Sequence, residues 1–368
     1  MSALWETILQ TQWQQVVMWA IGGLLIFLAI KKDMEPTLLL PIGFGAILVN
    51  LPLSGAVTQG DEVGVIDLLF DNGIANELFP LLLFVGIGAM IDFGPLLSNP
   101  KLMLFGAAAQ FGIFFTLSLA SLFVDMKDAA SIAIIGAADG PTSIFVANYF
   151  DSNYLGAIIV AAYSYMALVP IVQPPVIKLL TTKKERMIRM PYHQKNVSKT
   201  TRILFPIFIT VIAGLVSPKS VSLIGFLMFG NLIRECGVLD SLSETAQKVL
   251  ANLVTLFLGI TIAARMQADA FLNPQTLLIL ALGLFAFIFD TAGGVLFAKL
   301  LNLFLKNKIN PMIGAAGISA FPMSARVVHK MGLKEDNQNF LLMHSIGVNV
   351  SGQIASVIAG GLILNFVH

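Results

Sequence analysis

Residues 136 to 145 read GAADGPTSIF, and they place one carboxylate, Asp139, among glycines and a proline in an otherwise apolar part of the chain. A helix that begins after this kink would point its free N–H groups and its partial positive charge at Asp139. An ionised carboxylate is tolerated there, beside the hydroxyls of Thr142 and Ser143. We interpret the three residues as ligands for a cation; the alternative is that Asp139 only caps the helix.

Two later motifs carry oxygen and nitrogen groups in similarly apolar surroundings. The first, NPMIGAAGISAFPMSAR at 310 to 326, contains glycines and prolines that interrupt helical hydrogen bonding. The second, HSIGVNVSGQ at 344 to 353, lies in the last apolar run. Carbonyl, amide and hydroxyl oxygens are hard, weakly charged ligands that suit an alkali cation. The candidate residues of the two motifs are Asn310, Gly314, Ser319, Arg326, Asn349, Ser351 and Gln353.

Four of the polar residues have more than one interpretation. Arg326 either captures a carboxylate with its two-pronged guanidinium or anchors a helix end at the membrane surface. Asn349 is either a ligand or a hydrogen-bonding residue that packs helices together. Tyr165 lies in the middle of an apolar run, where its phenol could relay a proton or bind an ion. Asp290 is either a second ionic site or a counter-charge for Arg326.

The composition places these residues in a membrane. Of the 368 residues, 57% are hydrophobic and only 12% are charged, whereas soluble domains have roughly 45 to 50% apolar and about 25% charged residues. The net charge of +1 offers no basic field for a nucleic acid, and the single cysteine, Cys236, excludes an internal disulfide framework. The four histidines are scattered, so no catalytic metal is implied.

Apolar runs long enough to cross a bilayer recur along the whole chain. We predict an all-α polytopic membrane protein with about ten transmembrane helices. The predicted spans are 16–30, 37–53, 78–91, 101–123, 154–180, 203–217, 220–234, 249–263, 275–298 and 340–364. Two further segments, 131–150 and 309–326, are apolar but broken by glycine and proline. Such backbone survives at membrane depth only inside protein or along a cavity.

The loop charges orient the chain. The loop 181–202 holds seven lysines and arginines, and Lys31 and Lys32 follow the first span, so both are expected on the cytoplasmic side. The loop 54–77 holds five acids and no basic residue, as an external loop does. The crossings agree with these anchors only if 131–150 enters and returns on one side; a miscounted span is the alternative. We therefore predict two re-entrant hairpins.

The two halves of the chain resemble each other. Residues 96–123 align without gaps on 270–297, with Asn-Pro over Asn-Pro, and three further motif pairs follow in the same order. The halves are displaced by an odd number of crossings, which predicts inverted repeats. The predicted plan is an N-terminal helix (1–36), a first repeat (37–180), a basic loop with a linker helix (181–219) and a second repeat (220–368).

Four motifs, taken in their order along the chain, resemble the beta subunit of the biotin-dependent, sodium-translocating decarboxylases. They are GAADGPTSIF, AYSYMALVPIVQPP, NPMIGAAGISAFPMSARV and NFLLMHSIGVNVSGQIAS. This family comprises the oxaloacetate, methylmalonyl-CoA and glutaconyl-CoA decarboxylases. The resemblance covers nearly the whole chain, which is short before Asp139 and so closer to the acyl-CoA members. The family's functional residues match Asp139, Tyr165, Asn310, Gly314, Ser319, Arg326 and Asn349.

The resemblance implies an enzyme step that drives a pump in a bacterial cytoplasmic membrane. A carboxyltransferase alpha subunit would load a carboxyl group onto biotin on a carrier subunit, and this subunit would decarboxylate the carboxybiotin, consume a proton and export sodium. Arg326 would hold the carboxylate. Tyr165 and Ser319 would lie on the proton route. The implied sodium ligands are Asp139, Asn310, Gly314, Ser319 and Asn349.

The family also implies a small membrane gamma or delta subunit and a homo-oligomer such as a trimer. The alternative from the residues alone is a sodium-coupled symporter of an organic anion without chemistry. Composition and predicted topology fit both functions equally, and only the four-motif resemblance favours the decarboxylase.

Overall fold

The computed structural model describes residues 10–32, 35–191 and 196–367. Among these residues seven helical segments are long and apolar enough to cross a membrane, and no β-strand is present. The chain is therefore a multi-pass membrane protein. The segments are α2 (Trp13–Lys32), Pro100–Ala120 with α7 (Met103–Ala109) and α8 (Phe111–Ala120), α11 (Leu155–Leu180), α13 (Lys199–Val216), Asp240–Arg265 with α15 (Asp240–Glu244) and α16 (Ala251–Ile262), α18 (Pro274–Phe304) and α20 (Leu342–Phe366).

Each of the ten predicted spans contains a helix, but three of these helices are shorter than a bilayer crossing. They are α3 (Pro36–Val49), α5 (Leu78–Met90) and α14 (Val221–Cys236). The segment Val65–Ala75, with α4 (Val65–Leu69), precedes α5 at an angle of 61°, and the bent pair is long enough for an eighth span. The predicted N-terminal helix is α2; residues 1–9 and 33–34 of that region lie outside the described residues.

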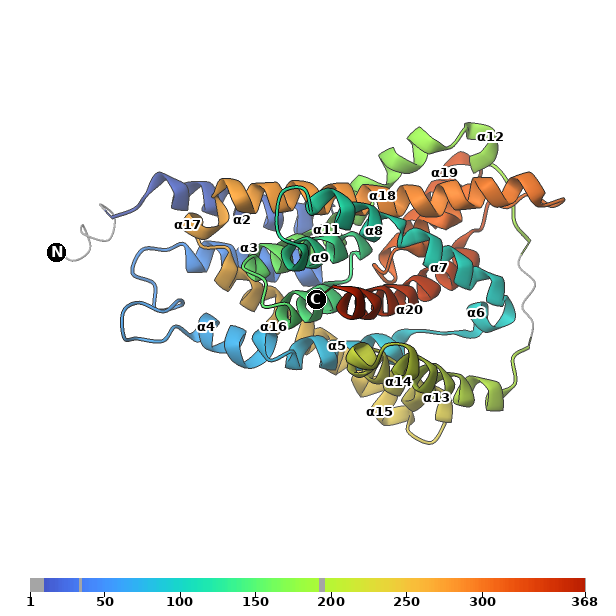
Figure 1. Cartoon of the computed structure of the whole chain (residues 1–368), viewed down its shortest axis with the longest axis horizontal. Coiled ribbons are helices and arrows are strands. Elements are labelled where there is room, and N and C mark those ends of the chain that lie inside the picture. Colours follow the sequence, from blue (N-terminus) through green and yellow to red (C-terminus); the bar gives the residue numbers. More distant parts are fainter. Residues whose placement is uncertain (1–9, 33–34, 192–195, 368) are drawn as a thin grey trace.

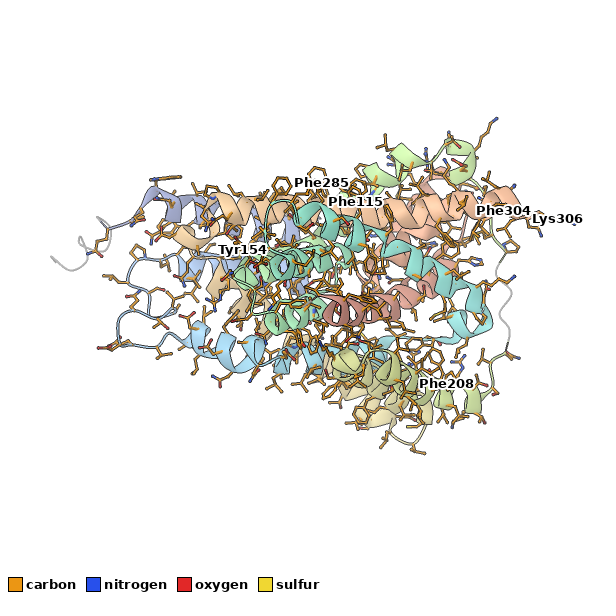
Figure 2. The ribbon with its side chains drawn as sticks, in the orientation of Figure 1. Phe115, Tyr154, Phe208, Phe285, Phe304 and Lys306 are labelled. Carbon is orange, nitrogen blue, oxygen red and sulfur yellow. The ribbon has the colours of Figure 1, made fainter. Side chains whose placement is uncertain are left out.

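The outer surface of the bundle is apolar. Figure 1 shows α18 running along one side of the molecule, with α13, α14 and α15 on the opposite side. Phe208 on α13 is 62% exposed and Phe285 on α18 is 51% exposed, and both lie at the outer edge of the bundle in Figure 2. Large side chains that stay exposed on a protein of this composition face lipid rather than water.

The first broken segment consists of α9 (Met126–Ala133), the 3₁₀ turn η3 (Ile134–Ala137) and α10 (Gly140–Tyr149). The helix breaks because Ala138 takes a left-handed conformation, with φ of 51°, and Asp139 is extended, with φ of −123°. Pro141 then fits the first turn of α10, since a proline there lacks only an N–H that has no intrahelical partner.

The two ends of this segment meet. Asp128 at the start of α9 accepts hydrogen bonds from Ser152 Oγ at 2.6 Å and from Asn153 Nδ2 at 3.4 Å, just beyond the end of α10. The chain therefore enters and leaves on the same side of the bundle, as the prediction of a re-entrant hairpin requires. We call residues 126–149 the first hairpin.

The second broken segment consists of the 3₁₀ turn η7 (Pro311–Gly317) and α19 (Met323–Glu335). Asn310 at its start donates from Nδ2 to the Arg186 carbonyl at 2.8 Å, and Glu335 at its end forms a 2.8 Å ion pair with the Arg186 guanidinium. This segment also returns to the side from which it started. It reaches Glu335 rather than ending at 326 as predicted. The prediction ended too early because the polar residues of α19 interrupt the apolar run, although the helix itself is continuous. We call residues 310–335 the second hairpin.

The two hairpins open at opposite ends of α11. This helix begins at Leu155, next to the mouth of the first hairpin, and it ends at Leu180, next to the loop that holds the second. Its 26 residues span about 39 Å at 1.5 Å per residue, enough to cross a bilayer core. The hairpin tips consequently approach each other from opposite sides.

Helix α18 supports the second hairpin. A Cβ atom added to Gly314 would lie 2.0 Å from the carbonyl oxygen of Gly294 on α18, and one added to Gly294 would lie 2.1 Å from the Gly314 oxygen. The two backbones touch, so neither position has room for a side chain. Gly314 is thus a packing residue of the hairpin in this structure.

Asp290 on α18 lies against the first hairpin. The side chain is fully buried, its Oδ1 accepts the Ile113 N–H at 3.0 Å, and its Oδ2 has no protein hydrogen-bond partner. A Cβ atom on Gly136 would lie 2.8 Å from Oδ2. Asp290 forms no ion pair with Arg326 among the described residues, so of the two alternatives for this residue the counter-charge role is not supported. It caps the start of α8 instead.

Candidate functional site

The tips of the two hairpins bond to each other in the interior. The Ser319 N–H of the second hairpin donates to the Ala137 carbonyl of the first at 2.9 Å. Asp139 is 3% exposed and Ser319 is 1% exposed. The two unwound segments therefore meet in the interior of the bundle, and Asp139 lies beside the point of contact.

Asp139 gathers three hydroxyl groups on one carboxylate oxygen. Its Oδ2 accepts hydrogen bonds from Thr142 Oγ1 at 2.8 Å, Ser319 Oγ at 3.0 Å and Ser356 Oγ at 2.8 Å. Its Oδ1 accepts only the Thr142 N–H, at 3.3 Å. All of these donors are neutral, so an ionised Asp139 has no positive counter-charge among its hydrogen-bond partners. The same hydroxyls can turn their lone pairs toward a cation, as hard oxygen ligands do.

Helix α20 presents a polar stripe to the tip of the second hairpin. Asn349 donates from Nδ2 to the Ile318 carbonyl at 2.7 Å, and Gln353 donates from Nε2 to the Ser319 carbonyl. With Ser356 they recur at i, i+4 and i+7, which places them on one helix face. Asn349 Oδ1 and Gln353 Oε1 are buried and have no protein hydrogen-bond partner. Buried acceptors are nearly always paired, so the two oxygens are candidates for binding an ion or water.

A cavity of about 310 Å³ joins Asp139 to Arg326. One part of the cavity is lined by Asp139, Ser319 and Gln353, and another part is lined by Arg326. Much of the wall is apolar and includes Leu83, Ile87, Met166 and Leu258. Arg326 lies in the first turn of α19 and is exposed. A small anion held by Arg326 would therefore share one cavity with the Asp139 cluster.

Tyr163, not Tyr165, lines this cavity. Tyr163 is fully buried, its hydroxyl has no hydrogen-bond partner, and a Cβ atom on Gly140 would lie 2.3 Å from its Cζ atom. The Tyr165 hydroxyl donates to the Leu280 carbonyl of α18. Because Tyr163 and Tyr165 are two residues apart on α11, their rings point to different sides of the helix. The prediction of Tyr165 on a proton route is therefore not supported by its position here.

Asn310 lies at the mouth of the second hairpin rather than at its tip. Its Oδ1 accepts the Met312 N–H at 3.1 Å, and its Nδ2 donates to the carbonyls of Arg186 and Ile188 at 2.8 and 2.9 Å. The amide nitrogen is thus bound to the loop and the amide oxygen to the backbone of the hairpin itself. The structure thus brings together Asp139, Ser319 and, through the hairpin backbone, Asn349, but not the predicted ligands Asn310 and Gly314.

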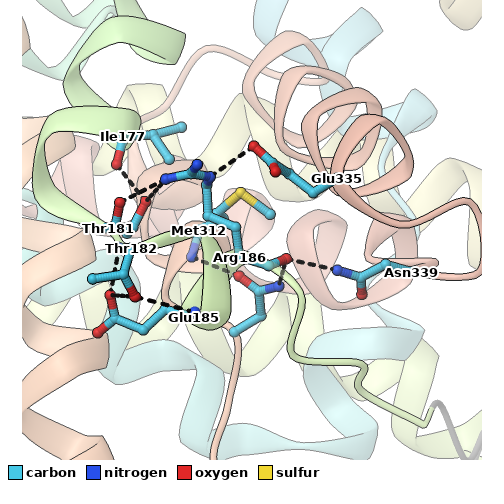
Figure 3. A network of polar contacts seen from close by, with 9 residues as sticks. Ile177, Thr181, Thr182, Glu185, Arg186, Met312, Glu335 and Asn339 are labelled. Atoms are coloured by element: carbon cyan, nitrogen blue, oxygen red, sulfur yellow. Dashed lines mark hydrogen bonds and ion pairs between the residues drawn. The ribbon is translucent and has the colours of Figure 1, made fainter.

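Arg186 ties the predicted cytoplasmic loop to both ends of the second hairpin (Figure 3). Its guanidinium pairs with Glu335 at 2.8 Å and its carbonyl accepts Asn339 Nδ2 at 2.9 Å. Next to it, Arg189 pairs with Asp336. The hydrogen bond from Arg189 holds the pKa of Asp336 below its usual value. The loop and the hairpin mouth therefore form one connected unit; Lys195 of the loop lies outside the described residues.

Ser356 and Tyr163 are the site residues that the sequence interpretation missed. Ser356 lies three residues beyond the motif that yielded Asn349, Ser351 and Gln353, and the i, i+4, i+7 spacing would have favoured it over Ser351. Ser351 instead bonds to the Leu102 carbonyl at 3.0 Å. No sequence signal distinguishes Tyr163 from Tyr165.

Comparison with known proteins identifies what the chain is similar to. The family model of the Na⁺-transporting oxaloacetate decarboxylase beta subunit matches residues 14–367. The glutaconyl-CoA decarboxylase subunit beta of Acidaminococcus fermentans is 50% identical over 96% of this chain and 94% of its own length. The methylmalonyl-CoA decarboxylase subunit beta of Propionigenium modestum is 46% identical over 95% of this chain and 94% of its own length. The oxaloacetate decarboxylase beta chain of Klebsiella pneumoniae is 46% identical over 96% of this chain and 95% of its own length.

Proposed function

The chain belongs to the family of Na⁺-transporting oxaloacetate decarboxylase beta subunits, and we propose that it decarboxylates carboxybiotin and couples this reaction to the outward transport of sodium. The observation that carries the proposal is the cavity shared by Arg326 and Asp139. One end of that cavity offers a cation for a carboxylate, and the other offers a carboxylate with hydroxyls for a cation.

Arg326 would bind the carboxylate of the carboxybiotin by paired N–H donors. The apolar wall of the cavity would strip water from that carboxylate, which favours the loss of neutral CO₂. In this step the bond between the carboxyl carbon and the ureido nitrogen breaks, CO₂ leaves, and the nitrogen takes up one proton. The hydroxyls of Tyr163 and Ser319 line the cavity and would deliver that proton.

Asp139 would alternate between sodium and a proton. With sodium bound, the ligand oxygens would come from Asp139, Ser319 and Ser356, joined by the unpaired oxygens of Asn349 and Gln353. When Asp139 takes a proton, the site loses its single negative charge and releases sodium. Because the tips of both hairpins supply ligands, a shift of one hairpin against the other would open the site to one side of the membrane and close it to the other.

The two hairpins would belong to inverted repeats, 37–180 and 220–368. Their mouths at opposite ends of α11 and their bonded tips support this arrangement. The complex would place the protein in a bacterial cytoplasmic membrane with a biotin carrier subunit, a carboxyltransferase alpha subunit and a small gamma or delta subunit. We propose a homo-oligomer, such as a trimer, for the assembly.

The decisive experiment is the decarboxylation of free carboxybiotin by the purified, reconstituted protein with and without sodium. We expect CO₂ release that rises with sodium and is accompanied by sodium uptake into inverted vesicles. Asp139→Asn should abolish both together, since the amide cannot carry the charge. A protein that moves sodium with an organic anion but releases no CO₂ would be a symporter, and the proposal would be wrong.

A further inference from the structure

A second cavity, outside the Asp139 site, is strongly basic. It has a volume of about 320 Å³ and lies between α11 and α19. Four cationic side chains line it, and among its described lining residues Glu35 is the one acid. We call this cavity the basic groove. Its cations are Lys178 of α11 and Arg326, Lys330 and Lys334 of α19.

None of these four cations forms an ion pair with another described residue. Neighbouring cations at the same end of the bundle behave differently: Arg186 pairs with Glu335, and Lys299 pairs with Glu185. The three cations of α19 recur every four residues, so they stack on one helix face. Like charges at this spacing destabilise a helix. An anionic partner would remove that penalty.

The groove continues into the cavity of the proposed reaction. Arg326, Met323 and Glu35 line both. The cavity floor between the lysines is apolar and includes Pro174 and Val327. A ligand that enters along the groove would therefore pass three lysines before its carboxylate meets Arg326. The three lysines provide more positive charge than one carboxylate needs, and they are exposed.

We propose that Lys178, Lys330 and Lys334 form the docking surface for an acidic face of the carrier protein, next to its biotin. This proposal rests on the proposed function, because it assigns the entrance of the same site. The apolar floor would hold the alkyl arm of the biotinyl lysine, and the lysines would hold carboxylates of the carrier surface. Charge complementarity of this kind speeds association and fixes the register of the partner.

The test uses the full-length protein in nanodiscs of zwitterionic phosphatidylcholine. The variant Lys178→Gln/Lys330→Gln/Lys334→Gln is compared with Lys183→Gln/Lys184→Gln/Lys306→Gln, which removes the same charge from three exposed lysines outside the groove. Three readouts are taken: the Kd of the biotinylated carrier without turnover, the KM for the carboxylated carrier, and the KM for free carboxybiotin. Each is measured at low and high salt.

We expect the groove variant to raise the Kd and the KM for the carrier by about tenfold and to flatten their salt dependence. The KM for free carboxybiotin should change less than twofold, and the control variant should match the wild type. Unchanged carrier binding, or an equal loss in the control, would overturn the proposal. An equal rise in the KM for free carboxybiotin would assign the lysines to the biotin group instead of the carrier surface. A difference between the groove variant and the wild type that is seen only after adding anionic phosphatidylglycerol would assign the lysines to lipid. Since the Kd needs no turnover, it tests the groove even if the protein releases no CO₂.

Discussion

Ser356→Ala is the sharpest test of the ion site, because the sequence interpretation did not single out this residue. Ser356 Oγ lies 2.8 Å from Asp139 Oδ2 and 3.0 Å from Ser319 Oγ. The substitution removes one proposed sodium ligand. It also removes one of the three hydroxyls that favour the ionised form of Asp139, so protons compete better with sodium.

The size of the effect follows from the contacts. A hydrogen bond to a charged group contributes about 1.5 to 3 kcal/mol, and about 1.4 kcal/mol corresponds to a factor of ten in affinity. We therefore expect the sodium concentration that half-saturates decarboxylation to rise about 10- to 100-fold. The maximal rate at saturating sodium should fall much less, because Arg326 and the cavity wall are unchanged.

Ser351→Ala is the matched control on the same helix. Ser351 is equally buried, but its hydroxyl bonds to the carbonyls of Leu102 and Val348. The control should lower thermal stability by about 1 kcal/mol and leave the half-saturating sodium concentration within about twofold. The assay is CO₂ release in proteoliposomes over a sodium titration, with thermal unfolding as the check of folding. Equal sodium shifts in both variants, or none in Ser356→Ala, would refute the proposed ligand set.

Four further substitutions test the other assignments. Tyr163→Phe should slow decarboxylation by about 100-fold, the usual scale for a lost proton donor. Tyr165→Phe removes only a hydrogen bond to a helix carbonyl and should slow it less. Single-turnover CO₂ release compares the two variants, and a larger loss in Tyr165→Phe would return the proton route to Tyr165. Arg326→Lys should raise the KM for carboxybiotin by about tenfold because the paired N–H donors are lost, while protection of the protein by sodium against proteolysis persists; loss of that protection first would place Arg326 at the ion site. Gly314→Ala should cost about 3 kcal/mol of stability, since its Cβ has no space against α18; normal thermal unfolding with weakened sodium binding would instead support Gly314 as a ligand.

The sequence was informative where burial makes polarity expensive. Asp139 and the broken backbone around it stood out because a charge and an interrupted helix are both unfavourable in a bilayer. The loop charges then favoured a re-entrant segment, and the bond between Ser152 and Asp128 closes it. The second broken segment was likewise predicted, since it carries glycines and prolines of the same kind.

The sequence was less informative about single side chains. It identified Asn310 and Gly314 by resemblance, yet in the structure the first binds the loop and the second packs on α18. Residue type cannot separate a ligand from a group that holds the backbone, because both roles use the same small or amide side chains. The predicted end of the second hairpin was also too early, since α19 is amphipathic and its charged face interrupts the apolar run.

The order of apolar and charged residues by itself determined that this chain carries several helices long and apolar enough to cross a membrane, and two apolar segments broken by glycine and proline. That follows from transfer energies, which depend on composition and spacing. Only the tertiary structure decided that Ser356 bonds to Asp139 and that Tyr163 lines the same cavity, while Ser351 and Tyr165 do neither. Those choices depend on the rotation of α20 and α11 about their axes, which is fixed by packing against neighbours far away in the chain.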